Sequence, residues 1–296
     1  MNEKINELHL HVDGSLRPST LKEWCPEIDI NSFGFTYGMN LYQALSLFKA
    51  TVEALNSPQR MYRCIKEICQ DQKELGVNKT ELRFAPHIHR VNAEEMLDAA
   101  ISALDENTTL TLCGLYGEHP DKFNKLVEMA KDRPEVVAID IAGGPKPTNK
   151  YSLHNYSESF QQAKKWGINR TAHLGEGRPP QEIIEAIELL DIQRIGHACS
   201  LLEDRYATQL VLNKQIVIEA CLTSNYHTGI YTNIKYHPLK EWIEKGLLVS
   251  ICADNSLMSR TNTLKEFLKA KSIFNLTDYE MNWLKFSSRL GIFKRD

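Results

Sequence analysis

Long apolar runs are absent from this 296-residue sequence. None reaches the ~18 consecutive apolar residues that a membrane-spanning helix needs. The opening segment MNEKINELHL also lacks the continuous apolar stretch of a secretory signal peptide. Apolar residues still make up 42% of the chain, which is enough for a sizeable core. We therefore expect a globular, cytoplasmic protein with no membrane partner.

Charge of one sign is not in excess. The 35 Lys and Arg residues nearly balance 38 Asp and Glu residues, and no run is rich in Lys or Arg. Because nucleic-acid binders normally carry a basic patch, no nucleic-acid partner is expected. The glycine-rich phosphate turns GxGxxG and GxxxxGK[ST] are missing as well. Their absence disfavours a doubly wound nucleotide-binding sheet.

Paired cysteine motifs are missing too. The chain has seven cysteines, an odd number, and no CxxC. Four of them lie in short apolar stretches: Cys113, Cys199, Cys221 and Cys252. We interpret these as reduced core residues, which argues against a zinc site made of thiolates.

Short apolar runs recur along the chain, separated by longer segments with helical periodicity. Eight runs have the length of a strand: 5–12, 79–87, 108–116, 135–143, 169–177, 194–199, 215–225 and 247–255. Helical spacing occurs at 93–104, 121–131 and 180–190, and again after residue 260. Strands that alternate with helices pair in parallel, so eight such units predict an α/β fold of the (β/α)8 barrel type.

The interval between the first two runs is the longest. It contains residues 41–55, which have helical spacing, and we expect extra helices there over the barrel mouth. No internal repeat, low-complexity segment or linker divides the chain. We therefore predict a single domain over residues 1–296.

Polar residues gather where the apolar runs end. His9 and His11 lie two apart in the first run, so on a strand they point to the same face. His173 is near the end of the fifth run and Asp254 near the end of the eighth. In a barrel the carboxyl ends of all strands meet at one mouth. Three imidazoles and one carboxylate there suit a single zinc ion with a position left for water, and we predict that site.

Two further residues near this mouth suggest catalysis. Glu176 follows His173 by three positions and is either a solvated loop carboxylate or, beside a metal, a general acid. His197, in RIGHA, is either a packing residue or a group that orients or deprotonates water. We predict catalytic roles for both, together with Asp254. Gly143 is either a plain turn or a close approach of backbone N–H to substrate, and the residues alone leave that choice open.

Other histidines are weaker candidates. His87 and His89 repeat the HxH pattern, but they follow Pro86 and have no evident carboxylate partner. We expect them to be structural or to lie at the rim. His227 could touch a substrate.

Seven motifs together resemble a known family. They are ELHLHVDGSLRP, ELRFAPH, VVAIDIAGGP, TAHLGEG, RIGHACSLLED, CLTSNYHTG and ICADNS, in this order over residues 7–256. The combination resembles the adenosine deaminase family of the amidohydrolase superfamily. A two-metal member of that superfamily would normally have a modified Lys on the fourth strand, where this chain has Asp140. The resemblance therefore implies a barrel with one zinc ion, held by His9, His11, His173 and Asp254.

The resemblance also implies an enzyme and a reaction. A hydrolytic deaminase would remove ammonia from a 6-aminopurine nucleoside such as adenosine. Glu176 would give a proton to the ring nitrogen beside the amino-bearing carbon, and His197 and Asp254 would position and deprotonate the attacking water. Gly143 matches the glycine whose N–H meets the purine, and Asp13 matches the aspartate that meets the ribose 5′-hydroxyl.

The remaining substrate residues are implied in the same way. Ser224 and Asn225 match residues that shape the site after the seventh strand. Asn255 stands where the family usually has an aspartate that bonds purine N7, and its amide can donate to N7 without being protonated.

The chain departs from the family at several points besides Asn255. Residues 143–145 read GGP, residues 114–120 read GLYGEHP, and the segments after the first two strands are short. Two alternatives therefore stay open. One is the same zinc chemistry on adenine, AMP, an N6-modified purine or a pterin, and the other is a non-catalytic binder of a small molecule. A nucleotide would need Lys or Arg near its phosphate, for which Arg17 and Lys22 are candidates.

Overall fold

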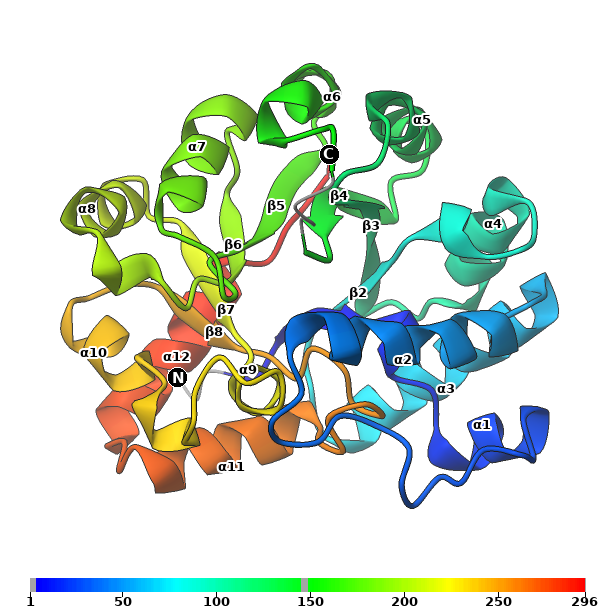
Figure 1. Ribbon diagram of the computed structural model, residues 1–296, viewed down its shortest axis with the longest axis horizontal. Coiled ribbons are helices and arrows are strands. Elements are labelled where there is room, and N and C mark those ends of the chain that lie inside the picture. The colour runs from blue at the N-terminus through cyan, green and yellow to red at the C-terminus, as the bar shows by residue number, and fades with distance from the viewer. Residues whose placement is uncertain (1–3, 145–148, 296) are drawn as a thin grey trace.

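The computed structural model describes residues 4–144 and 149–295, and it confirms the predicted barrel (Figure 1). Eight strands pair in parallel in chain order around one barrel. Their bounds are β1 Glu7–His11, β2 Thr80–Phe84, β3 Thr108–Leu115, β4 Val136–Ala142, β5 Asn169–Leu174, β6 Arg194–His197, β7 Val217–Ala220 and β8 Val249–Ile251. Nearly every strand residue is buried, as expected where helices cover the outside of a parallel sheet.

Helices surround the strands. Their bounds are α1 Pro18–Trp24, α2 Leu41–Ala54, α3 Pro58–Glu74, α4 Ala93–Ala103, α5 Pro120–Lys131, α6 Leu153–Lys165, α7 Gln181–Leu190, α8 Arg205–Asn213, α9 Leu222–His227, α10 Leu239–Glu244, α11 Thr263–Ile273 and α12 Asp278–Leu290. Local side-chain chemistry determines where several helices begin. The Asn92 side chain accepts hydrogen bonds from backbone N–H groups in the first turn of α4, and α3 and α5 each begin with a proline. The helices predicted at 41–55, 93–104, 121–131 and 180–190 are confirmed within one residue.

The backbone of one candidate metal ligand closes the barrel. Beyond β8, Asp254 forms an isolated bridge to β1: its N–H donates to the His9 carbonyl at 2.9 Å, and its carbonyl accepts from His11 N–H at 2.7 Å. The fold and the site are therefore coupled, because the segment that completes the barrel also brings Asp254 beside His9 and His11.

The predicted extra helices lie between β1 and β2. Helices α1, α2 and α3 occupy this interval, and α2 runs across the front of the barrel in Figure 1. Leu41, Leu45 and Phe48 of α2 line the central cavity. One helix therefore supplies much of the apolar wall above the mouth.

The seventh and fifth runs were predicted too long. In run 215–225, β7 ends at Ala220, and α9 begins at Leu222 with its own helical hydrogen bonds, such as Asn225 N–H to the Cys221 carbonyl at 3.0 Å. In run 169–177, β5 ends at Leu174. A short apolar run does not distinguish a strand from a strand followed by a buried helical turn, which explains the error.

Two sequence-based expectations about the rest of the chain can be compared with the structure. Among the described residues, no helix combines the length and apolarity required to cross a bilayer. All seven cysteines are free thiols, and Cys113, Cys221 and Cys252 are buried as expected, whereas Cys199 is only partly buried.

Candidate active site

Three imidazoles meet at the carboxyl end of the barrel. His9 and His11 come from β1 and His173 from β5. The Nε2 atom of His11 lies 3.1 Å from Nε2 of His9 and 3.0 Å from Nε2 of His173. Asp254 Oδ1 lies 3.5 Å from the Nε2 atoms of both His9 and His11. The structure thus brings the four predicted ligands to one point.

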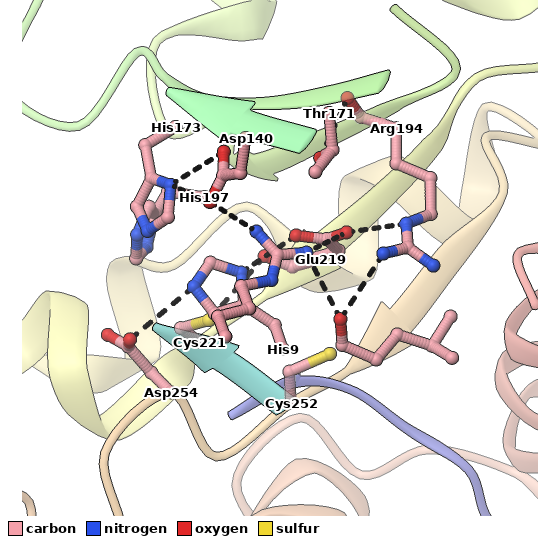
Figure 2. A network of polar contacts seen from close by, with 12 residues as sticks. His9, Asp140, Thr171, His173, Arg194, His197, Glu219, Cys221, Cys252 and Asp254 are labelled. Atoms are coloured by element: carbon pink, nitrogen blue, oxygen red, sulfur yellow. Dashed lines mark hydrogen bonds and ion pairs between the residues drawn. The ribbon is translucent and has the colours of Figure 1, made fainter. Parts of the chain in front are cut away.

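Carboxylates determine which imidazole nitrogens face that point. His9 donates from Nδ1 to Glu219 Oε2 at 2.7 Å, and His173 Nδ1 lies 3.0 Å from Asp140 Oδ2 (Figure 2). An ionised carboxylate can only accept, so both Nδ1 atoms carry the proton. The Nε2 atoms then face inward, and in a neutral ring each of them carries a lone pair.

Inward lone pairs fit a metal ion. Lone pairs about 3 Å apart repel one another unless a cation lies among them. Three imidazole nitrogens and one carboxylate oxygen are ligands that zinc accepts, and a carboxylate behind a ligating histidine is the usual supporting contact. The donor set of this site therefore suits a divalent metal.

A buried arginine lies behind the two supporting carboxylates. Arg83 of β2 donates from Nη1 to Asp140 Oδ2 at 3.1 Å and from Nη2 to Glu219 Oε1 at 2.6 Å. All three side chains are fully buried. Burial would raise the pKa of Glu219, but Arg83, Arg194 and His9 hold that pKa well below its usual value. Both carboxylates are therefore ionised when they hold the imidazoles.

The two residues predicted to be catalytic lie beside the candidate metal ligands. His197 ends β6, and Glu176 lies in the loop after β5, with Glu176 Oε2 3.7 Å from His197 Nε2. Both are buried and line the cavity. Burial lowers the pKa of the His197 imidazole, although Glu176 and Asp254 oppose that shift. His197 is therefore neutral near pH 7.

Two residues of the candidate site have a strained backbone conformation. His197 and Asp254 have φ angles of 68° and 62°, in the left-handed region that non-glycine residues rarely adopt. Gly196, directly before His197, has no room for a side chain without crowding, because a Cβ there would lie 3.0 Å from His9 Cε1. Such strain commonly occurs where a side chain must be aimed for function.

His11, His173, Asp254, Glu176 and His197 line one cavity of about 550 Å³, a volume suited to a small molecule. The substrate residues expected from the sequence, Asp13, Gly143, Ser224 and Asn255, all line it. Gly143 has φ 73° with free space around its missing Cβ, so backbone conformation rather than crowding favours glycine there. Asn255 packs against Gly14, where an added Cβ would lie 1.9 Å from Asn255 Oδ1.

Comparison with known proteins assigns the family. Residues 5–291 match the family model described as adenosine deaminase. The chain belongs to the adenosine deaminase family. Over 287 residues it is 30% identical to the adenosine deaminase of Clostridium kluyveri, an alignment that covers 88% of this chain and 81% of the relative. Membership makes the chain a hydrolytic deaminase.

Solved structures share the fold at lower identity. Adenine deaminase from Arthrobacter aurescens aligns with a TM-score of 0.89 and 22% identity, covering 99% of this chain and 95% of the other. An amidohydrolase from Burkholderia ambifaria, solved with bound Zn, aligns with a TM-score of 0.86 and 19% identity, covering 99% and 86%.

Two histidines outside the metal cluster have carboxylate neighbours that the sequence did not reveal. His89 does have a carboxylate neighbour: its buried ring has Nε2 3.2 Å from Asp13 Oδ1, although not aligned for a hydrogen bond. Burial alone would lower the pKa of His89, but Asp13 outweighs it and raises that pKa. His87 likewise pairs with Glu118, at 2.7 Å. The sequence did not reveal these partners because both lie on other strand–helix loops, and the paired histidines are consistent with the expected structural role.

The proposed phosphate ligands do not reach the cavity. Arg17 pairs with Asp71 of α3, and Lys22 donates to the Pro26 and Ile28 carbonyls. Neither lines the cavity, and His227 does not line it either. Pro145 of the GGP segment lies outside the described residues.

Sequence reasoning missed the residues that support the ligands: Arg83, Asp140 and Glu219. A signal was present, since each is a charged residue inside an apolar run that forms a strand. A charge placed there must be paired, because an isolated buried charge is very costly. The sequence did not show what each would pair with.

Proposed function

We propose that this chain catalyses zinc-dependent hydrolytic deamination of a 6-aminopurine nucleoside such as adenosine, with release of ammonia. One observation carries the proposal: the three imidazoles and Asp254 meet at the floor of a cavity that Glu176, His197 and Asp13 also line. A non-catalytic binder would not need this whole set of groups, whereas another aminated heterocycle would use the same chemistry.

The metal would be held by His9, His11, His173 and Asp254. When bound, zinc supplies a Lewis acid that makes hydroxide available near neutral pH. The relative from Burkholderia ambifaria with bound Zn supports that choice of metal. The inward Nε2 atoms of His9 and His173, set by Glu219 and Asp140, support a metal here independently.

Different side chains of the protein would carry out the two proton transfers. Glu176, as a carboxylic acid, would donate its proton to the ring nitrogen next to the carbon under attack. Asp254 is placed to accept a proton from the attacking water, and Gly143 offers its backbone N–H to the purine edge. The buried position of Glu176 and His197 keeps bulk water away from these transfers.

The charged residues that line the cavity favour a nucleoside substrate over a nucleotide substrate. Asp13 has a buried Oδ1 with no hydrogen-bond partner, which suits a hydroxyl donor such as the ribose 5′-OH and repels a phosphate. Among the described lining residues, Lys49 of α2 is the one Lys or Arg, and it is exposed at the rim. Phosphate recognition normally uses several such groups.

A free base is the competing substrate. The structural relative from Arthrobacter aurescens is an adenine deaminase, and adenine would leave Asp13 unused. The mostly apolar α2 wall would accept a base without a sugar.

Ammonia release tests both substrates. Zinc-loaded protein would be assayed for ammonia with adenosine, 2′-deoxyadenosine, adenine and AMP, and for methylamine with N6-methyladenosine, with Glu176→Gln as the matched control. We expect adenosine and 2′-deoxyadenosine to be the preferred substrates, and the control to lose at least about 100-fold in kcat. Preference for adenine or AMP would overturn the nucleoside assignment. Activity that survives in Glu176→Gln would overturn the catalytic assignment.

A further inference from the structure

The side-chain amide of Asn225 lies between the two catalytic groups. Its Nδ2 atom is 3.3 Å from Glu176 Oε1 and 3.0 Å from His197 Nδ1. Asn225 is fully buried in α9, and its backbone is bonded on both sides, to Cys221 at 3.0 Å and Ile230 at 3.1 Å. The amide is therefore held in place between Glu176 and His197.

The hydrogen-bond roles follow from counting donors. An amide NH₂ group has two hydrogens and no acceptor, and a carboxylate oxygen accepts. Nδ2 can therefore serve Glu176 and His197 together, provided that His197 Nδ1 is the acceptor. While Glu176 is ionised, the opposite amide orientation would place Asn225 Oδ1 against its carboxylate, oxygen against oxygen. Oδ1 has no hydrogen-bond partner of its own, so Glu176 and His197 alone decide the orientation.

We propose that Asn225 is a positioning residue that fixes neutral His197 in the tautomer with its proton on Nε2 and ties it to Glu176. His197 then donates a hydrogen bond into the cavity and does not take a proton there. The proton that leaves the attacking water has the Asp254 carboxylate as its acceptor, so the proton balance needs no base from His197. The catalytic meaning of this arrangement rests on the proposed deamination, whereas the tautomer itself does not.

A neighbouring residue offers a matched control. Thr228 Oγ1 lies 3.4 Å from the same Glu176 oxygen, but no contact joins Thr228 to His197. Thr228→Val removes one polar contact of Glu176 and keeps the shape of the side chain. A role limited to Glu176 would make Thr228→Val and Asn225 variants behave alike.

Nitrogen NMR reads the tautomer directly. The metal-loaded protein would be labelled with ¹⁵N in the histidine rings, and the His197 signals would be assigned by their loss in His197→Asn. We expect an unprotonated Nδ1 in the wild-type protein and in Thr228→Val. In Asn225→Asp, measured at pH 8, the new carboxylate can only accept, so Nδ1 should gain a proton.

The outcomes separate this inference from the proposed function. A wild-type His197 protonated on Nδ1 would overturn it, even if Asn225→Asp failed to fold. An Nδ1 that stays unprotonated in folded Asn225→Asp would overturn it as well. Both results are independent of any substrate, so an inactive wild-type enzyme would refute the proposed function and leave the tautomer decided.

Kinetics adds a second readout where a substrate is found. Because Asn225 acts through His197 and Glu176 and does not line the cavity, Asn225→Asp should lower kcat by roughly 100-fold with KM changed little. Thr228→Val, which also touches Glu176 but not His197, should lower kcat clearly less than Asn225→Asp does. Equal losses in the two variants would contradict a role for Asn225 beyond holding Glu176.

Discussion

The two ends of the cavity differ in how their buried polar atoms are satisfied. At the metal end, His9 and His173 each have a carboxylate on the outward nitrogen, and Arg83 bridges both carboxylates. At the substrate end, Asp13 Oδ1 and Asn255 Oδ1 are buried without a hydrogen-bond partner, and Asp13 Oδ1 has only the ion pair with His89 at 3.2 Å.

This difference indicates what each end is built to do. A buried polar atom without a partner costs about 1–3 kcal/mol, so such atoms persist where a ligand supplies the missing bond. At the metal end, contacts within the protein alone hold the side chains in place, and the site suits a metal ion. The substrate end is completed by its ligand, so the choice of substrate depends on the residues there.

Metal removal should have the largest effect. Dialysis against a chelator should abolish deamination and lower the melting temperature, and added zinc should restore both. A metal in 1,000-fold excess over its Kd stabilises the folded state by about 4 kcal/mol. Calorimetry and ammonia release on one sample check this. Full activity in metal-free protein, verified by elemental analysis, would remove the basis for treating this end as a metal site.

Replacing the bridging arginine should be the most destabilising single change. Arg83→Met leaves Asp140 and Glu219 buried with one partner fewer, and such a loss costs about 3–5 kcal/mol in unfolding free energy. Urea unfolding measures it. Arg63→Met is the control, because Arg63 pairs with Glu23 at the exposed surface and should lose less than about 1 kcal/mol. Similar losses in the two variants would show that burial of the Arg83 network contributes little.

Weakening one supporting carboxylate should lower the affinity for the metal more than it lowers the stability of the fold. Glu219→Gln keeps an acceptor for His9 but removes its charge, and such changes typically lower metal affinity by about 10–100-fold. Competition with a chromophoric chelator measures the affinity. Glu81→Gln is the matched control, since buried Glu81 pairs with Arg194 and Thr111 and not with a ligating imidazole. Equal affinity losses would mean that the effect comes from general loosening of the barrel interior.

The same comparison explains what the sequence could predict. The ligands were predictable because each follows an apolar run and the barrel brings strand ends together, as for His9 and His11 at positions i and i+2. The supporting contacts were not, because they join distant residues: His9 and Glu219 are 210 positions apart. The placement of Asn225 also depended on α9, which replaces the end of a predicted strand. Periodicity identifies elements, but side-chain partners across a barrel follow from register and helix geometry.

The smallest predicted effect lies at the substrate end. His89→Leu removes the ring beside Asp13, so Asp13 should hold a ribose 5′-hydroxyl less well. We expect kcat/KM for adenosine to fall by about fivefold, which corresponds to about 1 kcal/mol. Turnover of 5′-deoxyadenosine, which lacks that hydroxyl, should change much less.

The informative quantity in that experiment is the ratio of kcat/KM for adenosine to kcat/KM for 5′-deoxyadenosine. His87→Leu is the control, because His87 pairs with Glu118 and does not line the cavity. In His87→Leu, the ratio of the two kcat/KM values should equal that of the wild-type protein. If His89→Leu lowers kcat/KM equally for both substrates, Asp13 does not bind the 5′-hydroxyl. Another part of the ligand must then donate the hydrogen bond to its unpartnered oxygen. A selective loss would instead show that the atoms of this end without hydrogen-bond partners recognise the sugar, in contrast to His9 and His173, whose outward nitrogens have carboxylate partners.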